Sequence, residues 1–452
     1  MDINHWQQRL AELCEAHQVP GASLAVLIDG EVHECATGVL HLGTGVEATA
    51  DSLFQIGSIT KLYTATLVMQ LVAEGALDLD APVASVLPGF AVADPVATKT
   101  VTTRQLLSHT SGIDGDYFHD TGRGDDCLAA YVASCARLGQ NHPPGATMSY
   151  CNTGFTVLGR IVEVLTGQVW DDVLRERLLD PLGARSTVTL AEDVLRFRSA
   201  LGHLGEPGDD PVPAPVWGLS RSAGPAGTIN ATAADVVRFA RLYLDGGRTP
   251  DGTVVLPAEH VAAMCQPFVQ LPASHAHRMC WGLGWITYDW PGGRVIGHDG
   301  ATIGQKAFLR VVPEAGVAVA LLTNGGVPAE VYQRLFTELL TEHAGVAVPE
   351  FEPPAEPPAV DLGRYVGSYV REGYDVEVTE RDGVLNLRGE STGELAAINA
   401  VTNAVLVPVE EGLFAARRNA HEPWAPVVFY TLPDGSPYLH FSMRAAPKSP
   451  KN

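Results

Sequence analysis

The chain has 452 residues, of which 46% are hydrophobic and 18% charged, a balance typical of a globular protein rather than a disordered one. Its length allows two or three domains. The formal net charge of −22 argues against nucleic acid as a partner, because phosphates call for a basic surface.

The N-terminal region is predicted to form a helix and then a hairpin. Residues 1–17 place four apolar side chains on one helical face: Trp6, Leu10, Leu13 and Cys14. Residues 22–28 and 31–39 flank the turn Asp29-Gly30 and are predicted to pair as antiparallel strands.

A second helix is predicted to begin near Ser58 and to run towards Glu74. Its apolar residues occupy nearly every face, which is typical of a buried central helix. From about 100 to 245 the chain is predicted to form helices joined by loops rich in Gly, Pro and Asp. One of these helices spans the apolar positions between Val157 and Leu165, and Gly167 follows its end.

Strands return after this helical region, at residues 281–285, 295–297, 307–312 and 317–323, and residues 329–343 predict a closing amphipathic helix. The economical arrangement is an α+β fold. An antiparallel sheet is built from both ends of the region, and the helices form an insert between them.

The remainder is predicted to be a linker and a separate β domain. Residues 348–360 hold five prolines and three glutamates, which favours a stiff linker. Residues 374–378 and 384–387 predict one hairpin, and residues 427–432 and 438–443 predict another. We therefore divide the chain into an α+β domain, a linker and a small barrel or sandwich, at 1–347, 348–360 and 361–452.

Targeting signals and metal-ligand motifs are not apparent. The N-terminus has no basic patch followed by an apolar run, and no stretch of about 18 apolar residues occurs. The seven cysteines are scattered and fit reduced thiols. We expect a cytoplasmic protein with no membrane span, no metal and no cofactor.

Ser58-Ile59-Thr60-Lys61 opens the predicted buried helix. Residues three apart share a helical face, so the lysine amine can lie beside the serine hydroxyl. A serine needs a base to act as a nucleophile, and a lysine in a dry pocket has a lowered pKa that suits it to that task. The alternative is that Ser58 only caps the helix while Lys61 reaches solvent.

Tyr150-Cys151-Asn152 lies just before another predicted helix. A phenol held near a lysine can exchange protons with an attacking or leaving group, and the Asn152 amide can hold an acyl carbonyl and Lys61 together. The alternative is an ordinary helix cap in which Asn152 or Thr153 starts the helix.

His298-Asp299-Gly300 follows an apolar strand. His298 can bond the phenol or the substrate, and Gly300 can let a substrate approach the backbone. A structural histidine and a simple Asp-Gly turn are the alternatives.

These three motifs, in this order, resemble the serine β-lactamase and penicillin-binding-protein superfamily of the class C type. The flanking segments Leu106 to Ile113, Pro225 to Thr228 and Trp281 to Trp285 are also similar to it. The resemblance covers roughly residues 5–345. It implies that Ser58 is acylated, that Lys61 and Tyr150 manage its proton, and that the backbone N–H groups of Ser58 and Ala301 form the oxyanion hole.

Two positions depart from the family pattern. Cys151 replaces a common serine, and we interpret its thiol as a bystander. His298 stands where the resemblance places a lysine that reads the carboxylate of a β-lactam drug. This departure disfavours an antibiotic-resistance function.

The C-terminal domain looks like the lipocalin-like domain that some family members carry. Residues 365–369 and 439–444 carry this resemblance. With a Gly297 to Thr302 motif, this layout resembles the penicillin-binding-protein-type thioesterases, stand-alone cyclases of nonribosomal peptides such as the surugamides. The resemblance implies a peptidyl thioester or peptidyl carrier protein as partner and a D-configured residue at the acyl position. Arg444 would reach over the site to contact substrate, or would be an ordinary barrel-surface arginine.

Three functions remain open at this point. The first choice is a cyclase that releases a macrolactam, for which the peptide amine must outcompete water through proximity. The second is a D-aminopeptidase, D-amidase or esterase that uses the same residues with water as acceptor. The third is a catalytically inactive binding module.

Overall fold

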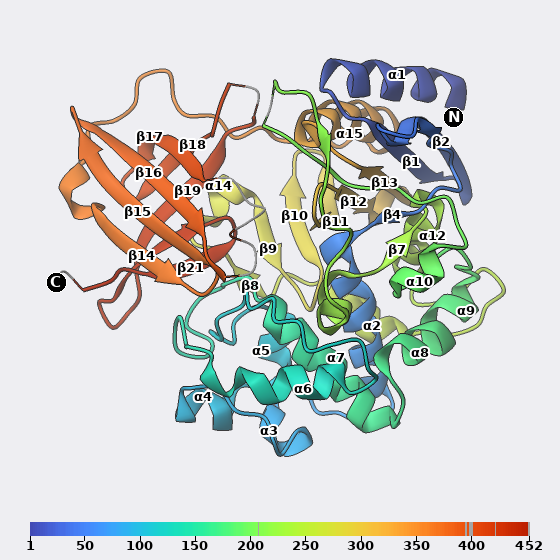
Figure 1. Cartoon of the computed structure of the whole chain (residues 1–452), viewed down its shortest axis with the longest axis horizontal. Coiled ribbons are helices and arrows are strands. Elements are labelled where there is room, and N and C mark those ends of the chain that lie inside the picture. Colours follow the sequence, from blue (N-terminus) through green and yellow to red (C-terminus); the bar gives the residue numbers. More distant parts are fainter. Residues whose placement is uncertain (207, 394–395, 397–400, 421, 451–452) are drawn as a thin grey trace.

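The computed structural model describes residues 1–206, 208–393, 396, 401–420 and 422–450. Residues 207, 394–395, 397–400, 421 and 451–452 lie outside this description, and all but the first belong to the predicted C-terminal domain. Figure 1 shows an α+β body and, beside it, an antiparallel barrel formed by the end of the chain.

The body contains a nine-stranded antiparallel sheet in the order β3-β2-β1-β13-β12-β11-β10-β9-β8. Strand β1 pairs with both β2 and β13, so the two ends of the region meet in one sheet, as predicted. The strands are β1 (Gly21–Ile28), β2 (Glu31–His41), β3 (Val46–Glu47), β8 (Val269–Gln270), β9 (Met279–Trp281), β10 (Ile286–Trp290), β11 (Gly293–Ala301), β12 (Lys306–Val312) and β13 (Val317–Thr323).

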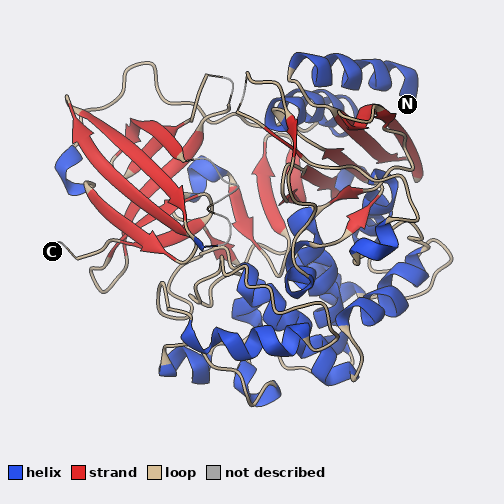
Figure 2. Ribbon diagram, viewed as in Figure 1, coloured by secondary structure: helices blue, strands red, loops and turns tan. Residues whose placement is uncertain are grey.

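Two short two-stranded sheets accompany it, β4 (Phe54–Gln55) with β7 (Asn230–Ala231) and β5 (His203–Leu204) with β6 (Val212–Pro213). Helices cover both faces of the large sheet (Figure 2). On one face, α1 (Ile3–Ala16) and α15 (Pro328–Ala344) bury an apolar stripe that includes Trp6 and Leu335. On the other, α12 (Ala233–Leu244) packs against β1 and β13.

The helical insert surrounds α2 (Thr60–Ala73), whose residues from Thr60 to Leu71 are all buried, as its all-round apolar pattern predicted. A single helical turn, Gly57–Ile59, leads into it. The other helices are α3 (Val83–Val86), α4 (Pro95–Thr100), α5 (Thr103–Leu107), α6 (Cys127–Ser134), α7 (Asn152–Thr166), α8 (Trp170–Leu174), α9 (Asp180–Leu182), α10 (Ala191–Val194), α11 (Gly224–Gly227), α13 (Ala258–Met264) and α14 (Ser274–His277).

The C-terminal barrel has eight strands in simple up-and-down order, consistent with the expected lipocalin-like domain. They are β14 (Gly367–Arg371), β15 (Tyr374–Arg381), β16 (Val384–Ser391), β17 (Thr402–Glu410), β18 (Leu413–Ala416), β19 (Ala425–Thr431), β20 (Pro437–Phe441) and β21 (Arg444–Pro447). A bridge between Tyr369 and Lys448 joins the first strand to the end of the last, so the barrel is nearly closed.

Two predicted strands are wrong in their bounds. Residues 281–285 were expected to be one strand, but β9 ends at Trp281 and β10 begins at Ile286, because Gly284 adopts a φ of 90° in the turn between them. Residues 438–443 were expected to be another, but Ser442 and Met443 have positive φ and form a tight turn. This turn carries β21 back towards the body.

The turn between β20 and β21 docks onto the loop before α7. The backbone N–H of Tyr150 donates to the Met443 carbonyl at 2.8 Å, and the N–H of Ala445 donates to Ser149 Oγ at 3.1 Å. The Tyr438 hydroxyl also donates to the Asn141 carbonyl at 2.8 Å. The barrel is therefore fixed next to the segment that carries Tyr150. Among the described residues, no helix has the length and apolar character needed to cross a membrane.

Candidate active site

Ser58 lies in the tight turn that opens α2, beside the end of β11. Gly57, just before it, has a φ of +50°, and a Cβ there would lie 2.5 Å from the Ala301 nitrogen. Only glycine combines this conformation with such close approach. The turn thus brings the backbone of Ser58 close to that of Ala301.

Lys61 lies on the same face of the helix as Ser58, as the spacing predicted. Its Nζ is 3.0 Å from Ser58 Oγ and 2.7 Å from the Ala226 carbonyl oxygen. The side chain is fully buried. Lys61 does not reach solvent, so the alternative of a helix cap with a solvated lysine is wrong.

The surroundings of Lys61 lower its pKa well below the ordinary value. Burial is the main cause, and the positive charge of Arg444 adds to it, whereas Asp116 and Cys151 act in the opposite direction. A neutral amine can donate to the Ala226 carbonyl and accept the proton of the Ser58 hydroxyl at once. This geometry suits Lys61 to act as a general base.

Tyr150 covers the Ser58–Lys61 pair from the start of α7. Its ring centroid lies 4.9 Å from Lys61 Nζ and stacks on His109 at 4.3 Å. Burial raises the pKa of its phenol, although the nearby Ser58 hydroxyl lowers it in part. The phenol oxygen has no hydrogen-bond partner among the described residues. A protonated phenol can donate to a leaving or arriving group.

His298 lies in β11 with its ring centroid 6.1 Å from that of Tyr150. Burial and the charge of Lys61 lower its pKa to about 4, so it is neutral near pH 7. Its Nδ1 donates to the Asp299 carbonyl at 2.6 Å, which leaves Nε2 as a buried acceptor with no partner among the described residues.

Gly300 packs closely against the chain before Ser58, and its contact with a substrate stays a prediction. A Cβ at this position would lie 1.8 Å from the Ile56 carbonyl oxygen and 3.2 Å from the Ser58 nitrogen. The glycine therefore lets β11 pack directly against the turn that holds Ser58.

Asn152 and Cys151 make contacts that the sequence did not predict, whereas the contact of Asn152 with an acyl carbonyl stays a prediction. The Asn152 amide donates to Asp116 at 2.8 Å, and no hydrogen bond to Lys61 is present among the described residues. The helix cap is Cys151, whose Sγ accepts the Gly154 N–H at 3.2 Å, so the alternative of a cap at Asn152 or Thr153 is wrong.

Arg444 reaches the site from the first position of β21. Its Nε and Nη2 each donate to the Asp116 carboxylate at 2.9 Å, and its guanidinium lies 4.8 Å from the Tyr150 ring centroid. Arg444 is thus not an ordinary barrel-surface arginine. Its contact with substrate stays a prediction.

Sequence reasoning missed Asp116, which links the barrel to the site. It accepts hydrogen bonds from Asn152, Arg371 and Arg444, and the last two come from the barrel. Burial favours the neutral acid, but the two arginines hold the pKa of Asp116 below its ordinary value. No motif surrounds this residue, so no sequence signal was available.

His109 was also missed, although it lies in the quoted segment Leu106 to Ile113. Its Nδ1 accepts the Cys151 N–H at 2.9 Å, and burial, Lys61 and His298 lower its pKa well below the ordinary value. The neutral ring then carries its hydrogen on Nε2. His109 forms the flat surface on which Tyr150 stacks.

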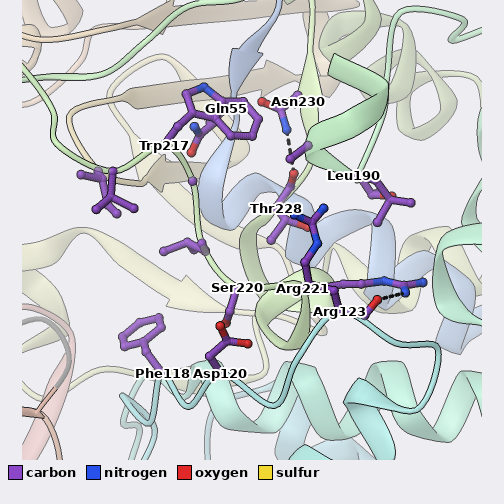
Figure 3. A pocket seen from close by; sticks show the side chains of 16 residues that line it. Gln55, Phe118, Asp120, Arg123, Leu190, Trp217, Ser220, Arg221, Thr228 and Asn230 are labelled. Atoms are coloured by element: carbon purple, nitrogen blue, oxygen red, sulfur yellow. Dashed lines mark hydrogen bonds between the residues drawn. The ribbon is translucent and has the colours of Figure 1, made fainter. Parts of the chain in front are cut away.

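A cleft of about 530 Å³ has Gln55, three residues before Ser58, in its lining (Figure 3). Gln55 and Asn230 line it and are almost fully buried, and the Asn230 Oδ1 has no hydrogen-bond partner among the described residues. Trp217 and Leu219 give the cleft apolar walls. The cleft therefore combines amide and apolar groups with three charged side chains, which are Asp120, Arg123 and Arg221.

The model of the family described as Beta-lactamase matches residues 6–365, most of the chain. The chain belongs to the beta-lactamase family. Penicillin-binding protein 4 of Amycolatopsis lactamdurans is a relative with 58% identity over 375 residues, which cover 82% of this chain and 98% of the relative.

Two solved structures of this superfamily are informative. The structure of SurE with D-Leu is 29% identical, with a TM-score of 0.75, and the match covers 99% of each chain, barrel included. The D-amino acid amidase from Ochrobactrum anthropi SV3, complexed with L-phenylalanine amide, is 27% identical. Its TM-score is 0.60, and the match covers 72% of this chain and 92% of the amidase.

Proposed function

We propose that this beta-lactamase family member is a serine acyltransferase that releases a nonribosomal peptide from a thioester as a head-to-tail macrolactam. One observation carries the proposal: the likeness to SurE extends over 99% of both chains, including the barrel whose Arg444 lies at the site. The D-Leu in the SurE structure supports a D-configured residue at the acyl position. A peptidyl carrier protein is the proposed donor.

In the first half-reaction, Ser58 Oγ attacks the thioester carbon while Lys61 Nζ, 3.0 Å away, takes the hydroxyl proton. The backbone N–H groups of Ser58 and Ala301 are proposed to stabilise the oxyanion. The carbon–sulfur bond then breaks, and the thiol leaves with the proton. The peptide is now an ester of Ser58.

In the second half-reaction, the amine of the same peptide attacks this ester, and the Ser58 oxygen leaves with the amine's proton, relayed by Lys61 and Tyr150. Water competes for the same ester. The turn that carries Met443 packs against Tyr150 and limits solvent at this face of the site, which favours a tethered amine. His298 offers its free Nε2 as an acceptor for substrate.

A hydrolase is the second candidate, and the likeness to the D-amino acid amidase favours it. A D-aminopeptidase, D-amidase or esterase would form the same acyl-Ser58 and pass it to water. A catalytically inactive binding module is the third candidate. The buried Ser58–Lys61 contact supports an enzyme instead.

Mass spectrometry of products separates the candidates. The substrates are peptidyl thioesters with a free N-terminal amine and a D- or L-residue at the acyl end. A product one water lighter than the linear acid, formed only from the D-series, supports the cyclase. Linear acid alone, or cleavage of D-amino amides, moves the assignment to the hydrolase, and absence of any acylated Ser58 moves it to the binding module.

A further inference from the structure

A second cleft, of about 490 Å³, lies between the barrel and the body. The start of β12 and the start of α15 form its body side, and strands β17 to β20 with their connections form much of its barrel side. It is distinct from the cleft of Figure 3, with which it shares no lining residue. Its volume suits a ligand of cofactor size.

Four cationic side chains line this cleft: Lys306, Arg371, Arg417 and Arg418. Among the described residues, Glu422 is the single carboxylate in its lining. This is a local excess of positive charge in a chain whose net charge is −22 and which has only five lysines. A local charge of this sign attracts anions and repels cations.

Within the part of the chain that the structure describes, two of these cations have no ion pair. Arg371 is held by Asp116 and Arg418 by Glu422, whereas Lys306 and Arg417 make no salt bridge or hydrogen bond among the described residues. Arg417 lies 4.3 Å over the Trp424 ring, which orients it without neutralising it. The acidic groups that act on this cluster at longer range are Glu422, Glu206 and Asp299.

The N-terminal end of helix α15 also borders the cleft. Helix α15 has 17 residues, and its first turn, at Val327 to Ala329, lines the cleft with no side chain capping it. The N-terminus of a long helix carries partial positive charge, but here Pro328 has no N–H and Glu330 places a carboxylate in the first turn. Lys306 and Arg417 therefore supply most of the attraction for a phosphate-like anion.

The cleft adjoins the acyl-transfer site on the barrel side. Lys306 pairs across the β11–β12 ladder with Ala301, whose backbone lies beside the turn that holds Ser58. Arg371 binds the same Asp116 that holds Arg444. Ser442, in the turn that docks on Tyr150, also lines the cleft.

We propose that this cleft binds the phosphate of the phosphopantetheine arm that carries the peptidyl thioester. The inference rests on the proposed function, in which the substrate has a peptide half and a thiol half. The peptide half suits the cleft of Figure 3, which offers amide groups and apolar walls beside its charged residues. The thiol half always contains a phosphate and suits the cationic cleft. After Ser58 is acylated, the thiol leaves with this arm.

Matched thioesters test the proposal in the acylation step. The same D-terminated peptide is attached to 4′-phosphopantetheine or to pantetheine, and kcat/KM for acyl-Ser58 formation is measured on the full chain. The wild type is expected to favour the phosphate-bearing thioester by about 10-fold, the size of one charge-assisted hydrogen bond. Lys306→Gln and Arg417→Gln should each reduce this ratio, and the double variant should bring it close to 1.

Lys99→Gln is the matched control, because Lys99 is an exposed lysine on α4, outside the lining of the cleft, and should keep the wild-type ratio. A wild-type ratio near 1, or a ratio that the double variant leaves intact, would overturn the proposal.

Direct binding separates this inference from the proposed function. Titration with 4′-phosphopantetheine alone, against pantetheine and inorganic phosphate, needs no turnover. Binding that requires both the phosphate and Lys306 upholds the site even where cyclisation fails. Equal binding of inorganic phosphate reduces it to a simple anion site, and no binding removes it.

Discussion

The guanidinium of Arg444, in the last strand of the barrel, lies 4.8 Å from the ring centroid of Tyr150, which precedes α7 in the body. The two residues are 294 positions apart in the sequence, yet the Tyr150 N–H also donates to the carbonyl of Met443, the residue before Arg444. The barrel thereby sets the electrostatic surroundings of Lys61 as well as covering the site.

Arg444→Gln should move the pH dependence of acylation to higher pH. Arg444 is a like charge that lowers the pKa of Lys61, and Lys61 must be neutral to take the Ser58 proton. In the variant the pKa of Lys61 rises. The pH at which the acylation rate begins to increase should therefore also rise. The rate of acylation by a small activated ester, measured across pH, checks this. Arg388→Gln, which changes an exposed arginine of β16, is the control. An unchanged pH dependence in Arg444→Gln would show that Arg444 does not set the pKa of Lys61.

Tyr150→Phe should lower the acyl-transfer rate by about 100-fold or more, because it removes proton transfer while keeping the ring. The aromatic contacts with His109 and Arg444 survive in this variant, so the fold is expected to remain intact. Single-turnover kinetics measure the loss. Tyr430→Phe removes a half-buried phenol at the contact between barrel and body, and should have a much smaller effect. Equal rates for wild type and Tyr150→Phe would remove Tyr150 from the mechanism.

Asp116→Asn should destabilise the protein by about 3 kcal/mol, because it leaves Arg444 and Arg371 without their buried partner. The folded pKa of Asp116 lies below the unfolded value of about 3.9, so its contribution is present above that pH and is lost as the pH falls further. Urea unfolding at pH 7 and at acidic pH measures both effects. Asp80→Asn breaks an exposed ion pair and should cost less than about 1 kcal/mol. An Asp116→Asn cost as small as this would show that the network does not hold the barrel.

Gly300→Ala should impair both stability and acylation. The added Cβ would lie 1.8 Å from the Ile56 carbonyl oxygen, so the turn that carries Ser58 must shift. We expect a loss of about 2 kcal/mol in the free energy of unfolding and at least about a 10-fold loss in acylation rate. Gly89→Ala, where a Cβ meets nothing within 4 Å, is the matched control. Normal acylation by Gly300→Ala would show that β11 does not position Ser58.

The local patterns of the sequence predicted much of this fold. The all-round apolar pattern after Ser58 predicted the buried helix α2, and the spacing of Ser58 and Lys61 predicted their contact. The hairpin turn Asp29-Gly30 predicted the pairing of β1 and β2. In each case the structure depends on residues that are near one another in the chain.

The parts that were missed depend on contacts between distant segments. Asp116 binds Arg444 across 328 positions, and nothing around it in the sequence marks it as special. The Ala226 carbonyl that accepts from Lys61 is a backbone atom and leaves no signature in residue type. Asn152 was assigned to Lys61 by its motif, but the unforeseen carboxylate of Asp116 takes its amide.

Acylation of Ser58 tests the account most directly. The full chain is mixed with a D-terminated peptidyl thioester, quenched in acid within seconds, and its intact mass is measured. We expect an increase equal to the peptidyl group, located by digestion to the segment that contains Ser58, with no increase in Ser58→Ala and almost none in Lys61→Ala. An increase that persists in Ser58→Ala, or a wild type whose mass never changes while its thioester is consumed, would contradict the assignment of Ser58 as the nucleophile.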